Sequence, residues 1–519
     1  MKSRCFLALA LFAFPLLGGV EPVAAMHSRL WGERGEAWQV DGPLPDFSRA
    51  GFREGDAALP VLPQSADVRD FGAKGDGVTD DTRAIQAAVE ATSAGAVYLP
   101  PGRYLISDFI RIRRPGVVLR GAGPERSVLW FPRGLDALHP RERKTASGTV
   151  ATGYSFEGGF VTIEGDYRER LLARPLEPVE RGERELRVDD VASLVPGRLL
   201  SVVAREDEAR LLARHLYDGD PGDLSKSKSF DARQLVRVEA VNGDRVRLDR
   251  PLRFALRPEW RPELREFEPS VTGSGVESLG FAFPGEIYAG HFKERGQNAI
   301  ELRGVYACWV RDVSIHNADL GVNVEARGCT LTGLRLSADA TREIQQGGGR
   351  GYTGHHGIQI KHGEDNLIAD FVIETTFFHD LSVEDAAGNV FTRGRGRDLC
   401  LDHHKDTPYL NLFTCLDLGR GTRPWMSGGG NSLGKNAAGR NVYWGLRADR
   451  DLKTPAKWWG PASLVFVGLR MEGLAGLRSE APWVEAIPPE ALSPADLHAA
   501  QLALRRQRAS QAPPVRAAF

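Results

Sequence analysis

One apolar pattern recurs through the second half of the chain and limits what the chain can fold into. The pattern has apolar residues at its first, fourth and sixth positions, and its starts lie 34, 21, 37, 23, 22, 30 and 23 residues apart. The copies are Val276-Leu279-Phe281, Val310-Val313-Ile315, Leu331-Leu334-Leu336, Ile368-Phe371-Ile373, Phe391-Gly394-Gly396, Phe413-Leu416-Leu418, Tyr443-Leu446-Ala448 and Phe466-Leu469-Met471. A base period of 21–23 residues with occasional insertions is typical of a solenoid of stacked coils.

A second, shorter apolar pattern precedes most of these copies. Its members are Ile300-Leu302, Val322-Val324, Ile358-Ile360, Leu381-Val383 and Leu399-Leu401. Two strands per coil, each with alternate residues facing inward, predict an all-β chain folded as a parallel β-helix.

Composition agrees with this architecture and excludes one class of partner. The 58 glycines and 31 prolines favour many tight turns over long helices. Hydrophobic residues make up 42% of the chain, as in a folded protein. Because the formal net charge is −1, no global field recruits nucleic acid or anionic lipid, and we expect neither nucleic acid nor a membrane as partner.

The N-terminus predicts export. Lys2 and Arg4 precede an apolar run over residues 5–20, and small residues follow it. Residues 1–25 are therefore predicted to be a cleaved signal peptide, which would place the mature protein in the periplasm or outside the cell. Residues 26–62, which contain several prolines, are predicted to form an extended arm.

Two sequence stretches then carry a resemblance to a known family. Residues 67–82 read DVRDFGAKGDGVTDDT, and residues 96–104 read AVYLPPGRY. A short helix followed by short strands at residues 66–123 resembles the first coil of the pectate-lyase-like superfamily, with its rhamnogalacturonase/epimerase-like N-terminal segment. The resemblance implies a right-handed single-stranded parallel β-helix and a bias toward glycan chemistry. It implies no single reaction, because similar proteins include lyases, glycosidases, uronan epimerases, fructan transferases and phage tailspikes.

The remaining chain divides by its pattern. Residues 63–134 are predicted to form the first coil and its cap, and residues 271–475 the coils that carry a catalytic face. Residues 135–270 lack the repeat but contain alternating strands, which predicts an inserted small β subdomain. Residues 476–519 are predicted to be a tail with a short helix.

Alignment of the second pattern places charged residues in one row on the surface of the solenoid, because parallel coils stack about 4.8 Å apart. The row is predicted to contain Arg303, Glu325, Lys361, Glu384 and Asp402. Salt bridges between coils would explain such a row, but not the histidines that crowd beside it. The candidate catalytic residues are therefore Lys361, Glu384, Asp402, His403, His404, His356 and His379.

Long insertions at residues 337–354 and 419–440 flank these coils, and a shorter one at residues 403–409 interrupts a coil. Long loops in a compact repeat are usually functional, although a solvated glycine-rich loop is the alternative. Aromatic and basic side chains near them could stack sugar rings and hold hydroxyl or carboxylate groups. The candidate substrate-binding residues are His355, Tyr352, Arg393, Lys405, Arg420, Arg423 and Trp425.

These residues favour a polysaccharide substrate and leave two reactions open. In β-elimination, a base removes the proton α to a uronate carboxylate while a cation stabilises the intermediate, and the mixture of lysine and histidines favours this reaction. In hydrolysis, two carboxylates such as Glu384 and Asp402 would flank the glycosidic bond. A uronan epimerase and a non-catalytic glycan-binding β-helix are further alternatives.

Neither reaction requires a cofactor. Glu384, Asp385 and Asp402 are candidate Ca²⁺ ligands, and no ordered spacing predicts a transition-metal site. The sequence leaves open the identity of the glycan, a homo-oligomer, and a disulfide between Cys308 and Cys329.

Overall fold

The computed structural model describes residues 24–145, 148–227, 231–346, 350–472 and 483–511. The predicted signal peptide lies outside these residues except for its last two positions. Within the described residues, no helix has the length and apolar character needed to cross a membrane.

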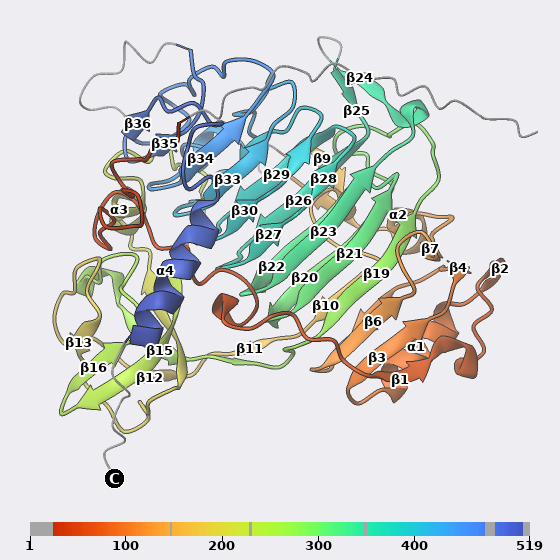
Figure 1. Ribbon diagram of the computed structural model, residues 1–519. Coiled ribbons are helices and arrows are strands. Elements are labelled where there is room, and N and C mark those ends of the chain that lie inside the picture. Colours follow the sequence, from red (N-terminus) through yellow and green to blue (C-terminus); the bar gives the residue numbers. More distant parts are fainter. Residues whose placement is uncertain (1–23, 146–147, 228–230, 347–349, 473–482, 512–519) are drawn as a thin grey trace, which may run out of the picture.

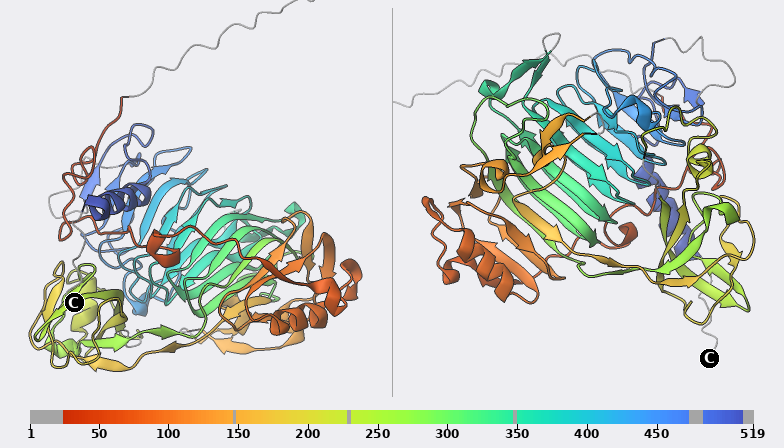
Figure 2. Two further views of the ribbon diagram at one scale, coloured as in Figure 1. Left: turned by 60° about the horizontal axis from the view of Figure 1, so that its bottom comes forward. Right: turned by 180° about the vertical axis from the view of Figure 1, so that it is seen from behind.

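The chain forms a right-handed parallel β-helix, as predicted, whose coils contribute strands to two long sheets (Figure 1 and Figure 2). We call them the large sheet and the small sheet. The large sheet stacks β1 (Gln64–Asp67), β3 (Gly95–Leu99), β6 (Val117–Gly121), β19 (Gly275–Ala282), β21 (Trp309–His316), β23 (Thr330–Ser337), β27 (Leu367–Ala369), β30 (Val390–Thr392), β33 (Leu412–Asp417), β34 (Val442–Arg447), β35 (Val465–Val467) and β36 (Trp483–Glu485). It is widened by β2 (Asp76–Asp80), β4 (Gly102–Leu105), β7 (Ser127–Trp130), β28 (Val372–Ile373) and β31 (Arg395–Gly396).

The small sheet carries the second pattern. It stacks β5 (Ile110–Ile112), β10 (Val161–Glu164), β20 (Asn298–Tyr306), β22 (Leu320–Arg327), β26 (Gly354–Lys361), β29 (Phe377–Glu384) and β32 (Leu401–His403). Every neighbouring pair is parallel, because each strand belongs to the next coil of the solenoid.

The register of the large sheet confirms the first pattern at every copy. The first residues of the copies pair in one continuous line, namely Val276, Val310, Leu331, Ile368, Phe391, Phe413, Tyr443 and Phe466. The small sheet follows the second pattern through Leu381, but its last copy is displaced: Leu381 pairs with Leu401, not with Leu399. The predicted copy Leu399-Leu401 is therefore wrong by two residues.

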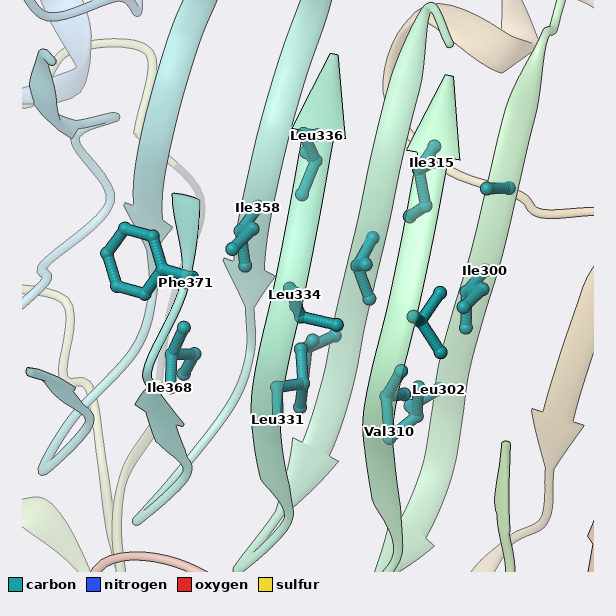
Figure 3. Packing of buried hydrophobic residues seen from close by; sticks show 14 of the residues in the cluster. Ile300, Leu302, Val310, Ile315, Leu331, Leu334, Leu336, Ile358, Ile368 and Phe371 are labelled. Carbon is teal, nitrogen blue, oxygen red and sulfur yellow. The ribbon is translucent and has the colours of Figure 1, made fainter. Parts of the chain in front are cut away.

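Between the sheets lies one continuous apolar core. Ile300, Leu302 and Ile358 of the small sheet face Val310 and Leu331 of the large sheet (Figure 3), and all five are fully or almost fully buried. Further along the solenoid the core becomes aromatic. The rings of Phe391, Phe413, Tyr443 and Phe466 stack with centroid separations of 4.8, 5.7 and 4.8 Å.

A row of buried asparagines ties together the turns that lead into the large sheet. Asn366, Asn389, Asn411 and Asn441 occupy the same turn in four successive coils. Each of the first three donates from Nδ2 to Oδ1 of the next, at 2.9, 3.0 and 3.1 Å. The row satisfies amide groups that burial would otherwise leave without hydrogen bonds.

A six-stranded antiparallel sheet forms the inserted subdomain and has a core of its own. It contains β12 (Leu171–Ala173), β17 (Glu263–Glu266), β14 (Leu199–Arg205), β15 (Asp231–Asn242), β16 (Arg245–Leu248) and β13 (Glu185–Arg187), with α3 (Leu211–Leu216) beside it. β11 (Tyr167–Arg168) and β18 (Glu268–Pro269) pair where the subdomain leaves the helix. The predicted range 135–270 begins too early, because β10 within it is a strand of the small sheet.

The predicted arm and tail both pack on the outer face of the large sheet. Leu44 and Phe47 of the arm lie in one apolar cluster with Trp444 and with Leu497, the first residue of α4 (Leu497–Gln511). Phe47 also donates its backbone N–H to Gln501 of α4 at 2.8 Å. In Figure 1, α4 crosses this sheet with the arm beside it. At the opposite end, α1 (Thr82–Ala91) buries Ile85, Ala88 and Val89 against the first coils.

Candidate functional site

The outer face of the small sheet presents a row of charged side chains. Arg303 pairs in register with Glu325, and Lys361 pairs with Glu384. Lys361 Nζ lies 3.4 Å from Glu384 Oε2, and the side chain of Glu384 is 21% exposed. In the next coil Val383 pairs with His403, so the residue that follows Glu384 in the row is His404, not the predicted Asp402. We call Lys361, Glu384 and His404 the charged row.

Asp402 instead pairs with Ser382 and is fully buried. Its Oδ2 accepts a hydrogen bond from Ser382 Oγ at 2.7 Å and lies 2.8 Å from His404 Nδ1 and 3.0 Å from His379 Nδ1. Its Oδ1 accepts from the Gly428 N–H at 2.8 Å. Asp402 therefore fixes two imidazoles and has no surface exposed to a substrate.

Five histidines meet behind the charged row, and we call them the histidine cluster. Its members are His291, His355, His356, His379 and His404. Centroid separations are 4.1 Å for His355–His356, 4.9 Å for His356–His379 and 5.0 Å for His379–His404. The predicted convergence of imidazoles from successive coils is present, although most of these rings are buried.

The ionisation of these groups follows from burial and from Asp402. Burial lowers the pKa of His355 and of His356 well below the usual histidine value. Burial opposes the charged form of His404 as well, but the carboxylates of Asp402 and Glu384 outweigh it and raise the pKa of His404 to about 9. Burial alone would raise the pKa of Asp402, yet the adjacent imidazoles hold it well below the usual value.

His403 lies in the core, contrary to its prediction as a catalytic residue. It takes the inward position that Val383 takes in the preceding coil, and it is fully buried. Its Nε2 lies 3.1 Å from Tyr443 Oη, and its ring contacts Phe413 and Trp459. Burial lowers the pKa of His403 to about 4, so the residue is a neutral core side chain.

Most of the predicted substrate-binding residues have internal partners instead. His355 belongs to the histidine cluster, and Tyr352 is buried 5.0 Å from the Phe378 ring. Arg423 is buried in an ion pair with Asp380, and Lys405 Nζ donates to Gly434 O at 2.6 Å.

The remaining predicted substrate-binding residues are Trp425, Arg393 and Arg420. The Trp425 ring packs against Tyr443, Trp459 and Phe466 of the core. Arg393 follows β30 of the large sheet and binds Asp370 and Asp496, away from the charged row. Arg420 is exposed, and its backbone N–H donates to Arg397 O at 3.0 Å. Arg393 is therefore not brought together with the charged row, because it follows a strand of the other sheet.

The predicted Ca²⁺ ligands are not brought together. Asp402 turns toward His379 and His404, while Asp385 pairs with His362 at 2.7 Å. Among the described residues, the carboxylates of Glu384, Asp385 and Asp402 do not form a group whose oxygens all lie within 4.8 Å of one another. The groups that meet this criterion contain histidines instead.

Two carboxylates near the row have opposite ionisation preferences. Burial alone would raise the pKa of Glu384, but Lys361 and His404 hold it below the usual value. Burial together with the carboxylates of Glu384 and Asp385 raises the pKa of Asp406 to about 6. At pH about 6, Glu384 is thus ionised, whereas about half of the Asp406 side chains carry a proton.

A cleft of about 930 Å³ lies beside the row, between the small sheet and the inserted subdomain. Its lining includes Arg303 and Glu325 from the small sheet, His362 and Asp385 from the turns after Lys361 and Glu384, and Glu169 and Arg233 from the subdomain. The cleft is mostly charged, which suits a hydrophilic ligand better than an apolar one.

Sequence reasoning missed His291, Glu294 and Asp406. His291 and Glu294 lie in the long connection between β19 and β20, which the 34-residue interval between the first two copies of the pattern signals. Asp406 lies in the interruption at residues 403–409. Cys308 and Cys329, whose pairing the sequence left open, are free buried thiols.

Comparisons with known proteins agree with the resemblance seen at the N-terminus. Residues 65–139 match the family model described as rhamnogalacturonase A/epimerase, pectate lyase-like. Alginate lyase 7 of Azotobacter vinelandii is 39% identical over 108 residues, which are 19% of this chain and 12% of that protein. Mannuronan C5-epimerase AlgE4 of the same organism is 36% identical over 108 residues, or 19% of each chain.

Among solved structures, the tailspike protein gp49 from Pseudomonas phage LKA1 aligns over 76% of this chain and 64% of that chain, with 14% identity and a TM-score of 0.40. The sequence matches span less than a fifth of the two curated relatives. Residues 65–139 of this chain thus carry the rhamnogalacturonase A/epimerase, pectate lyase-like sequence, and the predicted resemblance is confirmed there.

Proposed function

We propose that the protein cleaves a uronic-acid-containing polysaccharide by β-elimination at the charged row. The observation that carries this proposal is the placement of Lys361, Glu384 and His404 side by side on three successive coils. A cation beside an ionised carboxylate is what abstraction of a proton α to a carboxylate requires, because the cation stabilises the enolate-like intermediate.

In this proposal, the substrate carboxylate binds beside Lys361, and Glu384 accepts the proton from the carbon α to that carboxylate. The bond from the neighbouring carbon to the glycosidic oxygen then breaks, a carbon–carbon double bond forms, and the leaving oxygen takes up the proton that Glu384 received. Lys361 and His404 lie in the coils before and after Glu384, so His404 would contact the sugar on the side of Glu384 opposite to Lys361. Asp402 Oδ2 holds the His404 ring in place at 2.8 Å from Nδ1.

The relatives support the same class of substrate. One is named an alginate lyase and another a mannuronan C5-epimerase. Elimination and epimerisation both begin with removal of the proton α to a uronate carboxylate, so the row could serve either reaction. In this proposal further sugars lie in the neighbouring cleft of about 930 Å³, which is lined by His362 and Asp385, the residues that follow Lys361 and Glu384.

One observation favours a second candidate, glycoside hydrolysis. Glu384 is ionised, whereas the pKa of Asp406 is raised to about 6 by burial and by Glu384 and Asp385. Two carboxylates with separated pKa values are what a general acid and a nucleophile or base need. The two candidates share Glu384 but differ in their need for Asp406.

The test is a screen of the purified protein against polyuronates and neutral glycans. Ultraviolet absorbance of an unsaturated uronate, together with new reducing ends, would identify the lyase, and Asp406→Asn should then remain active. New reducing ends without absorbance, lost in Asp406→Asn, would identify the hydrolase. Changed uronate configuration at constant chain length would identify an epimerase, and binding without any product would identify a glycan-binding protein.

A further inference from the structure

We propose that His291, His355 and His379 form a binding site for a divalent first-row transition-metal ion such as Zn²⁺. We call these residues the three-histidine site. It differs from the predicted Ca²⁺ site in residues and in ligand chemistry, and it departs from the expectation that no cofactor is required. The proposal does not depend on the reaction proposed above.

The geometry of the three imidazoles is close to that of a metal site. One nitrogen from each ring lies within 4.8 Å of the other two. Ring centroids are 4.5 Å apart for His291–His355, 5.4 Å for His355–His379 and 6.3 Å for His291–His379. Zn–N bonds of about 2.0–2.1 Å would place the nitrogens of a tetrahedral site roughly 3.4 Å apart, so the nitrogens need to approach by up to about 1.4 Å.

One buried nitrogen in this site lacks a partner. Among the described residues, Nε2 of His355 has no hydrogen bond, while the Nδ1 atoms of His355 and His379 lie beside carboxylates. Both side chains are almost completely buried, at 2% and 1% exposure. A buried polar atom without a partner is rare in native proteins and points here to a missing ligand.

Two carboxylates stand behind the rings in the arrangement that metal-bound histidines use. Glu294 Oε1 lies 3.2 Å from His355 Nδ1, and Asp402 Oδ2 lies 3.0 Å from His379 Nδ1. Each Nδ1 thus faces a carboxylate oxygen that can accept its proton. The Nε2 atoms are then left for the ion, as in carboxylate–histidine–metal triads.

Both carboxylates are held from their other sides. Glu294 Oε1 accepts from Tyr288 Oη at 2.5 Å and from the Phe292 N–H at 3.1 Å, and Oε2 accepts from Ser155 Oγ. Asp402 is fixed by Ser382 and Gly428. These contacts fix the second layer of the site before any ion binds.

The charge balance also favours a cation. The Glu294 side chain is fully buried, and in the described part of the chain its one ion-pair partner is His355. A buried carboxylate without a permanent cation nearby is costly, and a dication on His355 would offset it. Imidazole nitrogens select ions such as Zn²⁺, Cu²⁺ or Fe²⁺ over Ca²⁺ and Mg²⁺, which prefer oxygen.

Aromatic side chains shield the site from water. The Phe378 ring stacks on the His291 ring, with their centroids 4.4 Å apart and an interplanar angle of 8°. The centroids of the Phe292 and His355 rings are 6.1 Å apart. His291 is partly exposed, so an ion would enter from its side. Three protein nitrogens leave a fourth position open to water or to a substrate oxygen.

The experiment uses the chain from Met26 onward without an affinity tag, stripped with a chelator and titrated with Co²⁺, whose visible absorption reports nitrogen coordination. We expect about one Co²⁺ per chain, competition by Zn²⁺, and a higher melting temperature for the loaded protein. His291→Ala should weaken binding by at least about tenfold, and Glu294→Gln by about 10- to 100-fold. His316→Ala is the matched control, since His316 is exposed and pairs with Asp339 outside the cluster.

His291 is chosen because it lies at the exposed edge of the site, where alanine leaves the core intact. Far-ultraviolet circular dichroism of each metal-free variant checks the fold. The proposal is overturned if the unmodified protein shows no Co²⁺ absorption band. It is also overturned if His291→Ala and Glu294→Gln bind Co²⁺ as tightly as His316→Ala does.

Discussion

The two sheets of the helix differ in what fills their inward positions. In the large sheet, the line from Val276 to Phe466 is apolar or aromatic in every coil. In the small sheet, the line through Ile360 and Val383 ends in His403. The uniform sheet is scaffold, and the pattern breaks in the coil that carries Asp402 and His404. A break in the apolar repeat of a solenoid is expected where side chains serve a purpose other than stability.

The largest expected effect tests the outer face of the small sheet. Glu384→Gln should lower kcat by about 10²- to 10⁴-fold, because the residue is proposed to accept the proton. Because the variant leaves the buried Lys361 without its partner, circular dichroism and the melting temperature must show that it stays folded. Glu374→Gln, whose carboxylate pairs with Arg335 of the large sheet, is the control and should remain active. Normal turnover in Glu384→Gln would remove the site assignment.

The interior of the large sheet should show the opposite behaviour. Phe413→Ala removes a fully buried ring from the aromatic stack, and we expect a loss of about 3–5 kcal/mol in the free energy of unfolding, measured with urea. Thr332→Ala on the outer face of the same sheet should cost less than about 1 kcal/mol. Equal losses in the two variants would contradict the scaffold role of the interior.

The arm that packs on the outer face of the large sheet is joined to the inserted subdomain by an acid-sensitive contact at Glu54. Burial alone would raise the pKa of Glu54, but Arg250, Arg49 and Arg237 lower it to about 2. The contribution of Glu54 is therefore complete above pH about 4.5 and disappears as the pH falls toward about 2.

We expect Glu54→Gln to lower the free energy of unfolding by about 1–3 kcal/mol at pH 7. The difference from the unmodified protein should shrink as the pH is lowered through this window. A pH-independent difference in urea midpoints would show that the ion pairs do not fasten the arm.

The smallest effect concerns the exception in the small sheet. His403→Leu restores an apolar inward residue and leaves Tyr443 Oη without its partner at 3.1 Å, so we expect a cost of about 1–2 kcal/mol. Turnover should be unchanged, because His403 is enclosed by the core. Loss of turnover in a stable His403→Leu protein would place His403 among the functional residues.

The same contrast explains what could be predicted from the sequence. The register of the large sheet follows from apolar spacing alone, because one face of each strand is buried. The apolar spacing misplaces the copy at Leu399, because the inward residue of that strand is a histidine, His403, and its outward neighbour Asp402 is buried. The displacement moved Asp402 into the row and left His404 out of it.

The convergence of His355, His356, His379 and His404 could be predicted because all four follow the coils. His291 could not, because a long connection brings it there and no period fixes its place. The burial of Arg423 and Lys405 also escaped prediction, since sequence does not show that a loop folds back over its own coil. These contacts depend on Asp380 and Gly434, which only the tertiary structure brings near.

The asparagine row bears on how the coils that carry the charged row come apart. The side-chain amides of Asn366, Asn389 and Asn411 each donate to the next asparagine of the row. Opening a single turn therefore leaves a buried donor or acceptor of the neighbouring turn without its hydrogen bond. Fraying from the far end of the solenoid is therefore penalised at every step from Asn441 inward. The segment that holds Lys361, Glu384 and His404 should exchange its amide hydrogens as one cooperative block, slower than the turns outside it.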